Sequence, residues 1–151
     1  MTAATRLVPM TKAHVDRLMP FEKEMFGAEA WPASSYRDEL ADRHNRYYVA
    51  VESPEGELLG WGGVLVVTGS AELLTVGVVP AARRRGLARL MLAELYREAR
   101  ARGAQEMFLE VRVDNTSARD LYAAEGFADV GTRRGYYDNG RTDAVVMRRE
   151  L

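Results

Sequence analysis

Three consecutive arginines, Arg83, Arg84 and Arg85, stand before Gly86 at a change of sequence pattern. The residues before them, 73–79, are apolar and rich in β-branched side chains, which is typical of a strand. Apolar residues recur at helical spacing after Gly86. The start of a helix offers unpaired backbone N–H groups and a positive dipole end, and arginines pair with phosphate oxygens. The turn therefore predicts a site for a phosphorylated ligand. A solvated basic helix start is the alternative.

A single acid interrupts the apolar run MFLEVRV. A carboxylate inside a strand costs free energy unless it is solvated or paired, so Glu110 is a candidate for acid–base chemistry. The alternative for Glu110 is a salt bridge to Arg112 or to another arginine. Tyr122 lies in ARDLYAAEGF, on the next expected helix. Tyr122 is a second candidate for acid–base chemistry, and a core tyrosine with a hydrogen-bonded hydroxyl is the alternative.

Composition excludes several classes of protein. The formal net charge of −1 gives no global basic field for nucleic acid, and 28% charged residues argue against a membrane protein. The absence of cysteine excludes disulfides, thiolate metal sites and cysteine nucleophiles. No apolar run approaches the roughly 20 residues that span a bilayer, and no signal-peptide core is present. We expect a cytoplasmic protein.

The order of patterns predicts one mixed α/β (α+β) domain over residues 1–151. Three strands joined by short turns indicate an antiparallel meander, and the strand–helix–strand order that follows indicates a parallel crossover. The expected strands are 5–9, 46–52, 58–67, 71–79, 105–113, 127–132 and 142–149. The expected helices are 11–26 with a kink or restart at Pro20, 34–43, 86–102 and 115–125. A loop, RRGYYDNGR, separates the last two strands.

The form R-x-x-G-x-A of the arginine turn resembles the acetyl-CoA pyrophosphate loop, R/Q-x-x-G-x-G/A, of the GNAT family of N-acetyltransferases. The segments LEVRVDNTSARDLYAAEGF and RRGYYDNGRTDAVVM resemble the bacterial ribosomal-protein-alanine N-acetyltransferases in that family. The element order agrees over essentially the whole chain. The resemblance implies the GNAT fold, a mixed and mostly antiparallel central sheet that is splayed at the cofactor site and flanked by about four helices.

The resemblance also implies a binding site for acetyl-CoA. The strand segment Val76, Gly77 and Val78 would pair with the pantetheine arm, and a glycine in a β-branched run suits the strand bulge of the family. Asn115 would contact the cofactor, with helix capping as the alternative. The pyrophosphate would be held by Arg83, Arg84, Arg85, Gly86, Leu87 and Ala88. Ala88 stands where many members have glycine, which the signature permits.

Two residues would carry the chemistry by this resemblance. Glu110 would be the general base that deprotonates the attacking amine, and Tyr122 the general acid that protonates the leaving thiolate. An α-amine titrates about 2.5 pKa units below a lysine, which favours a chain terminus as the acceptor. Proton transfer from a tyrosine to a thiolate is uphill by about 1.5 pKa units, a gap that site electrostatics can close.

The resemblance also implies that aromatic residues bind the acceptor peptide, as they do in the related enzymes. Trp31, Tyr136 and Tyr137 are the candidates, and packing over the sheet edge is the alternative for the tyrosines. No histidine–carboxylate cluster has metal spacing, so we expect no metal, and we place His14 and His44 on the surface.

The resulting hypothesis is acetyl transfer by direct attack in a ternary complex, since no nucleophile motif is present. The acceptor would be a protein N-terminal amine, and fit to the family suggests the N-terminal alanine of ribosomal protein S18. We expect a monomer or weak dimer that binds neither nucleic acid nor membranes. The alternatives are acetylation of lysine or of a small amine, and a non-catalytic module that responds to acetyl-CoA.

Overall fold

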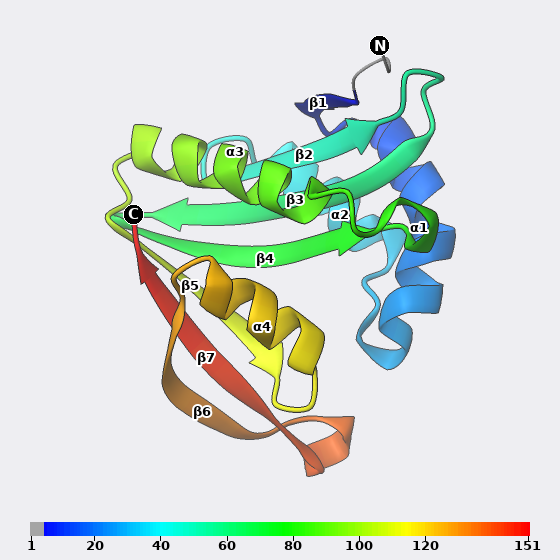
Figure 1. Cartoon of the computed structure of the whole chain (residues 1–151). Helices are drawn as coiled ribbons and strands as arrows, with labels where there is room; N and C mark the ends of the chain where they lie inside the picture. The colour runs from blue at the N-terminus through cyan, green and yellow to red at the C-terminus, as the bar shows by residue number, and fades with distance from the viewer. Residues whose placement is uncertain (1–4) are drawn as a thin grey trace.

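The computed structural model describes residues 5–151, which form a seven-stranded sheet with helices on both faces (Figure 1). The strand order is β1-β2-β3-β4-β5-β7-β6, and neighbours are antiparallel except β4 and β5, which are parallel. The mixed, mostly antiparallel sheet is thus confirmed. The strands are β1 (Arg6–Pro9), β2 (Arg46–Glu52), β3 (Leu58–Val67), β4 (Ser70–Val78), β5 (Glu106–Arg112), β6 (Ala128–Tyr137) and β7 (Thr142–Glu150). The helices are α1 (Lys12–Phe26), α2 (Ala33–Ala41), α3 (Leu87–Ala101) and α4 (Thr116–Ala124), with short 3-10 turns η1 (Gly27–Glu29), η2 (Pro80–Ala82) and η3 (Asp138–Gly140).

Strand β3 is packed too closely for side chains at Gly60 and Gly63. A Cβ on Gly63 would lie 2.1 Å from Cε2 of Tyr48, and one on Gly60 would lie 2.9 Å from Cε of Met91. The glycines that interrupt this strand in the sequence therefore mark close packing against neighbouring side chains.

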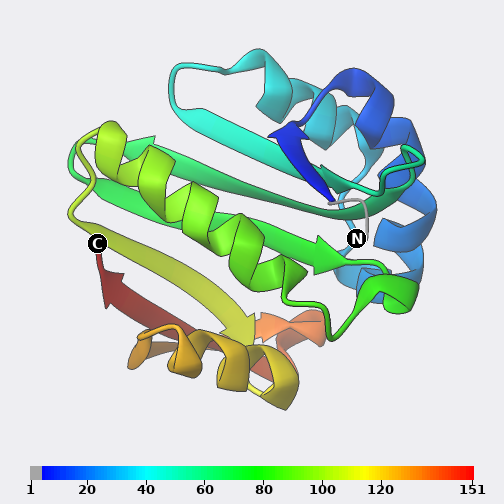
Figure 2. The same cartoon turned by 45° about the horizontal axis from the view of Figure 1, so that its top comes forward.

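Helix α3 covers one face of the sheet, and α4 lies on the same face beside it (Figure 2). Leu87, Met91 and Leu95 follow one another at a spacing of four residues and are buried under α3. Leu90 lies three residues after Leu87, a spacing that would suit the same face, but it is 42% exposed. The buried face of α3 instead includes Leu92, so its centre lies away from position 90. Leu90 therefore lies at the edge of the helix, where solvent reaches it. Among residues 5–151, no helix is long and apolar enough to cross a membrane.

The opposite face is covered by α1 and α2 (Figure 1). The predicted restart at Pro20 is wrong, because α1 runs unbroken through it. Pro20 removes one backbone hydrogen bond, but Val15 and Leu18 are fully buried and anchor the preceding turns.

The surface position predicted for His14 is also wrong. Its side chain is buried, its Nδ1 accepts from the backbone N–H of Thr11, and its Nε2 lies 3.3 Å from Oε2 of Glu52. That carboxylate supplies a polar partner inside the fold.

Strand β6 extends five residues beyond the predicted end at 132, into the segment expected to be a loop. Its pairing with β7 is interrupted between Arg133 and Tyr137. Within this interruption Gly135 adopts a φ of 62°, and its N–H donates to Oδ1 of Asp143 at 2.9 Å. The glycine and the aspartate produce a bulge that resembles a loop in the sequence.

Candidate active site

Strands β4 and β5 separate after three paired residues. Their parallel pairing is confined to 70–72 and 106–108. Beyond it, residues 73 and 75–78 of β4 pair with β3, and 109–112 of β5 pair with β7. In Figure 1 the two arrows begin side by side and end apart. The sheet is therefore open between these strands, and residues 76–78 lie on one wall of the opening.

The bulge in β4 does not lie at Gly77, as the sequence suggests, but at Leu74. The register with β3 passes from Leu73 to Thr75 and leaves Leu74 without a partner. Gly77 keeps a regular partner, Trp61, and a Cβ on Gly77 would lie 2.8 Å from Cζ2 of that tryptophan. The glycine is required by the close approach of the indole ring.

The turn between β4 and α3 presents a run of unpaired donors. Within residues 5–151, the backbone N–H groups of Arg84 through Arg89 have no protein acceptor, whereas the N–H of Leu90 donates to the carbonyl of Gly86. Arg84 and Gly86 adopt φ values of 64° and 76°, which curve the turn. Leu87 is buried and anchors the helix start, while the three arginines and Gly86 are exposed. Consecutive N–H groups beside exposed arginine cations form a concave site suited to a diphosphate.

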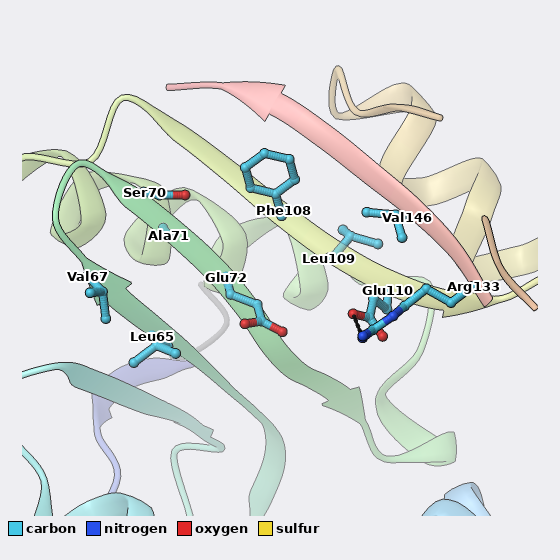
Figure 3. A pocket seen from close by; sticks show the side chains of 10 residues that line it. All are labelled: Leu65, Val67, Ser70, Ala71, Glu72, Phe108, Leu109, Glu110, Arg133 and Val146. Atoms are coloured by element: carbon cyan, nitrogen blue, oxygen red, sulfur yellow. Dashed lines mark hydrogen bonds and ion pairs between the residues drawn. The ribbon is translucent and has the colours of Figure 1, made fainter. Parts of the chain in front are cut away.

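Glu110 lines a pocket on the face of the sheet away from α3 and α4 (Figure 3). Residues alternate along β5, so the buried Leu109 and Val111 face the helices while Glu110 faces the pocket. The pocket has a volume of about 400 Å³. It is lined by Leu65, Val67, Ser70, Ala71, Glu72, Phe108, Leu109, Glu110, Arg133 and Val146.

The Glu110 carboxylate forms an ion pair, as the alternative interpretation allows, but its partner is Arg133 of β6. Nη1 of Arg133 donates to Oε1 of Glu110 at 2.6 Å, and Glu110 remains 22% exposed. A second carboxylate, Glu72, stands at the last position of β4 that pairs with β5, where the opening begins, and lines the same pocket (Figure 3). Partial desolvation in the pocket, followed by repulsion from Glu110, raises the pKa of the exposed Glu72 above its usual range. The pocket thus holds two carboxylates and one cation, in which Glu110 is paired yet reachable.

Tyr122 lies on α4, on the opposite face of the sheet from Glu110. Its ring packs edge-on against Phe127, with centroids 5.8 Å apart. Burial alone raises its pKa to about 12, and its hydroxyl has no hydrogen-bond partner among residues 5–151. The phenol therefore keeps its proton and has a hydrogen-bond donor that the described residues do not use.

The aromatic candidates come from two segments that Arg112 ties together. Nη1 of Arg112 donates to Oε1 of Glu29 in η1, and Nη2 donates to Oδ2 of Asp138 in η3, both at 2.7 Å. Trp31 follows η1 and is half-buried, while Tyr136 is 50% exposed at the end of β6. Their rings therefore belong to segments joined at one end of β5. Tyr137 packs on Tyr136 at a centroid distance of 4.9 Å, and the guanidinium of Arg112 lies 5.4 Å from its ring.

Asn115 caps α4, because its Oδ1 accepts from the N–H of Ala118 at 3.1 Å. The capping alternative is thus realised in the structure, and the exposed Asn115 amide nitrogen stays available for another contact. The described part of the chain contains no cluster of three or more histidine, aspartate or glutamate side chains arranged to hold a metal.

Comparison with known proteins assigns this arrangement to a family. Residues 14–127 match the family model described as the Acetyltransferase (GNAT) family. The chain belongs to the GNAT family. It is therefore an acetyl-CoA-dependent N-acetyltransferase, as the arginine turn and the C-terminal motifs predict.

Relatives of this GNAT protein match it along most of its length. It is 39% identical to the N-alpha-acetyltransferase RimI of Mycobacterium tuberculosis, over 99% of this chain and 97% of that protein. It is 31% identical to the ribosomal protein bS18-alanine N-acetyltransferase of Escherichia coli K12, over 78% of each. The crystal structure of the ribosomal-protein-S18-alanine N-acetyltransferase from Escherichia coli has a TM-score of 0.85 to it, with 25% identity over 98% of this chain and 94% of that one.

Proposed function

We propose that this GNAT enzyme acetylates the N-terminal α-amine of a protein that begins with alanine, and that ribosomal protein S18 is its substrate. The observation that carries the proposal is the opening between β4 and β5, which separates a diphosphate-type turn on one side from a carboxylate-lined pocket on the other. Relatives named for the same activity on S18 support the choice of acceptor.

The donor would occupy the α3 and α4 side of the opening. The N–H groups of 84–89 and the exposed arginines would bind the pyrophosphate of acetyl-CoA, the backbone of 76–78 would pair with its pantetheine arm, and Asn115 would add a polar contact. Acetyl-CoA supplies the activated acetyl thioester. Backbone groups near Val78 would polarise the thioester carbonyl at the opening.

The acceptor would enter from the pocket side, with Trp31, Tyr136 and Tyr137 holding its first residues. Glu110 would take the proton from the α-amine, directly or through a water, as the amine nitrogen attacks the acetyl carbon. Tyr122 would donate to the sulfur as the C–S bond breaks. Attack would be direct, because the chain contains no cysteine and no serine in a nucleophile motif.

The substrate assignment can be tested with two peptides offered side by side. We expect acetylation of a peptide with a free N-terminal alanine, and none of an N-blocked peptide that carries a lysine. Mass spectrometry of cells with and without this chain should show loss of N-terminal acetylation on S18. Acetylation of the lysine peptide alone would overturn the proposal, as would acetyl-CoA binding without any acetylated product in a proteome extract.

The pyrophosphate assignment predicts a defect confined to the donor. Replacing Arg84 and Arg85 together with alanine should raise KM for acetyl-CoA by about 10- to 100-fold, because charge-assisted hydrogen bonds contribute about 1.5–3 kcal/mol each and exposed ones less. The kcat at saturating acetyl-CoA should stay near wild type. The double variant Arg43→Ala/Arg100→Ala removes the same charge from exposed positions elsewhere and should leave this KM unchanged. Equal effects of the two double variants would contradict the assignment.

A further inference from the structure

Three buried polar side chains form a connected row through the core. It comprises Glu22 of α1, Tyr36 of α2 and Trp61 of β3, which are 2%, 0% and 0% exposed. The hydroxyl of Tyr36 donates to Oε1 of Glu22 at 2.5 Å and accepts from Nε1 of Trp61 at 3.1 Å. The hydroxyl of Tyr36 and the indole N–H of Trp61 therefore each donate to a partner within this set.

Glu22 is unusual among the carboxylates of residues 5–151, because it is buried and no cation lies within ion-pair distance. A buried carboxyl group is expensive unless hydrogen bonds compensate. Burial, and then the Glu22 charge, raise the pKa of Tyr36 far above its usual range. Tyr36 therefore keeps its proton and remains the donor to Glu22.

One end of this row of polar side chains, at Glu22, holds the segment proposed to contact the acceptor. Oε2 of Glu22 accepts from the backbone N–H of Trp31 at 3.0 Å. The ring of Trp31 also packs on the ring of Tyr36, with centroids 5.0 Å apart. The backbone and the side chain of Trp31 are thus both fixed by the same pair of residues.

The other end holds the strand proposed to bind the donor. Trp61 pairs with Gly77 across β3 and β4, and its indole fills the space where a Cβ on Gly77 would lie. The wall of the opening at residues 76–78 therefore rests on Trp61. A continuous path of contacts leads from this wall through Tyr36 and Glu22 to Trp31.

We propose that Glu22, Tyr36 and Trp61 form a positioning network that sets the acceptor-contacting segment at Trp31 relative to the donor strand β4. The proposal rests on the proposed function. The hydroxyl is the informative group, because a phenylalanine at position 36 would keep the ring contacts. It would lose two hydrogen bonds: the one that orients Glu22, whose second oxygen holds Trp31, and the one that the indole N–H of Trp61 donates.

The variant Tyr36→Phe tests this network, with Tyr48→Phe as the matched control. Tyr48 is also buried, its ring packs against Tyr36, and its hydroxyl donates to a carboxylate, Oε1 of Glu39, at 2.6 Å. Both variants should lower the unfolding midpoint. Only Tyr36→Phe should raise KM for an alanine-starting peptide, by about 10-fold as one hydrogen-bond equivalent, while KM for acetyl-CoA stays within about twofold of wild type.

A second measurement is independent of activity. Hydrogen exchange of the Trp31 amide, which donates to Glu22, should become at least about 10-fold faster in Tyr36→Phe and stay unchanged in Tyr48→Phe. Glu22→Gln should give the same pattern if Tyr36→Phe does not fold. If the Tyr36 and Tyr48 variants shifted the peptide KM and the Trp31 exchange rate equally, both hydroxyls would act only by stabilising the fold. That result would overturn the proposal. If the wild-type protein failed to acetylate the alanine peptide, that result would contradict the proposed function instead. The exchange experiment would still test whether the network positions Trp31.

Discussion

Replacing Glu110 with glutamine should reduce kcat on an alanine-starting peptide by about 10²- to 10⁴-fold, the usual contribution of a general base. Glutamine has nearly the same size and shape as glutamate, but it cannot take a proton from the attacking amine. Because the donor would bind on the other face of the sheet, the Kd for acetyl-CoA should not change. Initial rates between pH 6 and 9 and a separate titration with acetyl-CoA would measure both quantities.

The matched control for this experiment is Glu106→Gln. Glu106 lies on the same face of β5 four residues earlier, and its Oε1 accepts from Nε of Arg148 at 2.7 Å, much as Glu110 pairs with Arg133. Each substitution therefore removes one carboxylate and one ion pair from the same strand. Only the Glu110 variant should lose turnover. Near wild-type activity of Glu110→Gln across the pH range would show that another group acts as the base.

The parts of the fold that were predictable are those with strong local patterns. The strands at 46–52 and 58–67 have the predicted bounds, because alternation and turn residues define them without reference to the rest of the chain. The end of β6 was not predictable in this way. Its strand character depends on pairing with β7, which the glycine at 135 and the Asn-Gly pair at 139–140 obscure in the sequence.

The candidate site divides along the same line. Glu110 is recognisable as an acid inside an apolar run, and the arginine turn by its composition. Arg133 and Glu72, which share the pocket with Glu110, carry no such signal, because their contact arises from three strands that are distant in sequence. Arg112 was considered only as a partner of Glu110. In the structure it instead bridges Glu29 and Asp138, 83 and 26 residues away. Such long-range ion pairs become visible only once the topology is known.

Replacing Tyr122 with phenylalanine should lower kcat by about 10²-fold, comparable to the loss of one preorganised donor to a developing negative charge. With a pKa of about 12, the phenol stays protonated at all pH values from 6 to 10. Transfer of its proton to a thiolate with a pKa near 8.5 would be uphill by about 3.5 pKa units before the C–S bond weakens. The hydroxyl should therefore act first as a hydrogen-bond donor to the sulfur, and the pH–rate profile of the variant should run parallel to that of wild type.

Tyr96→Phe provides the control, because both tyrosines pack against Phe127 but only Tyr96 donates to a protein acceptor, Oε1 of Glu125 at 3.1 Å. Loss of that bond should destabilise the Tyr96 variant by about 1 kcal/mol and leave kcat unchanged. The Tyr122 hydroxyl has no partner within residues 5–151, so its removal should leave the unfolding free energy unchanged while kcat falls. A Tyr122 variant that keeps full turnover, or that loses stability and turnover together, would assign this residue to the core and leave protonation of the leaving sulfur to water.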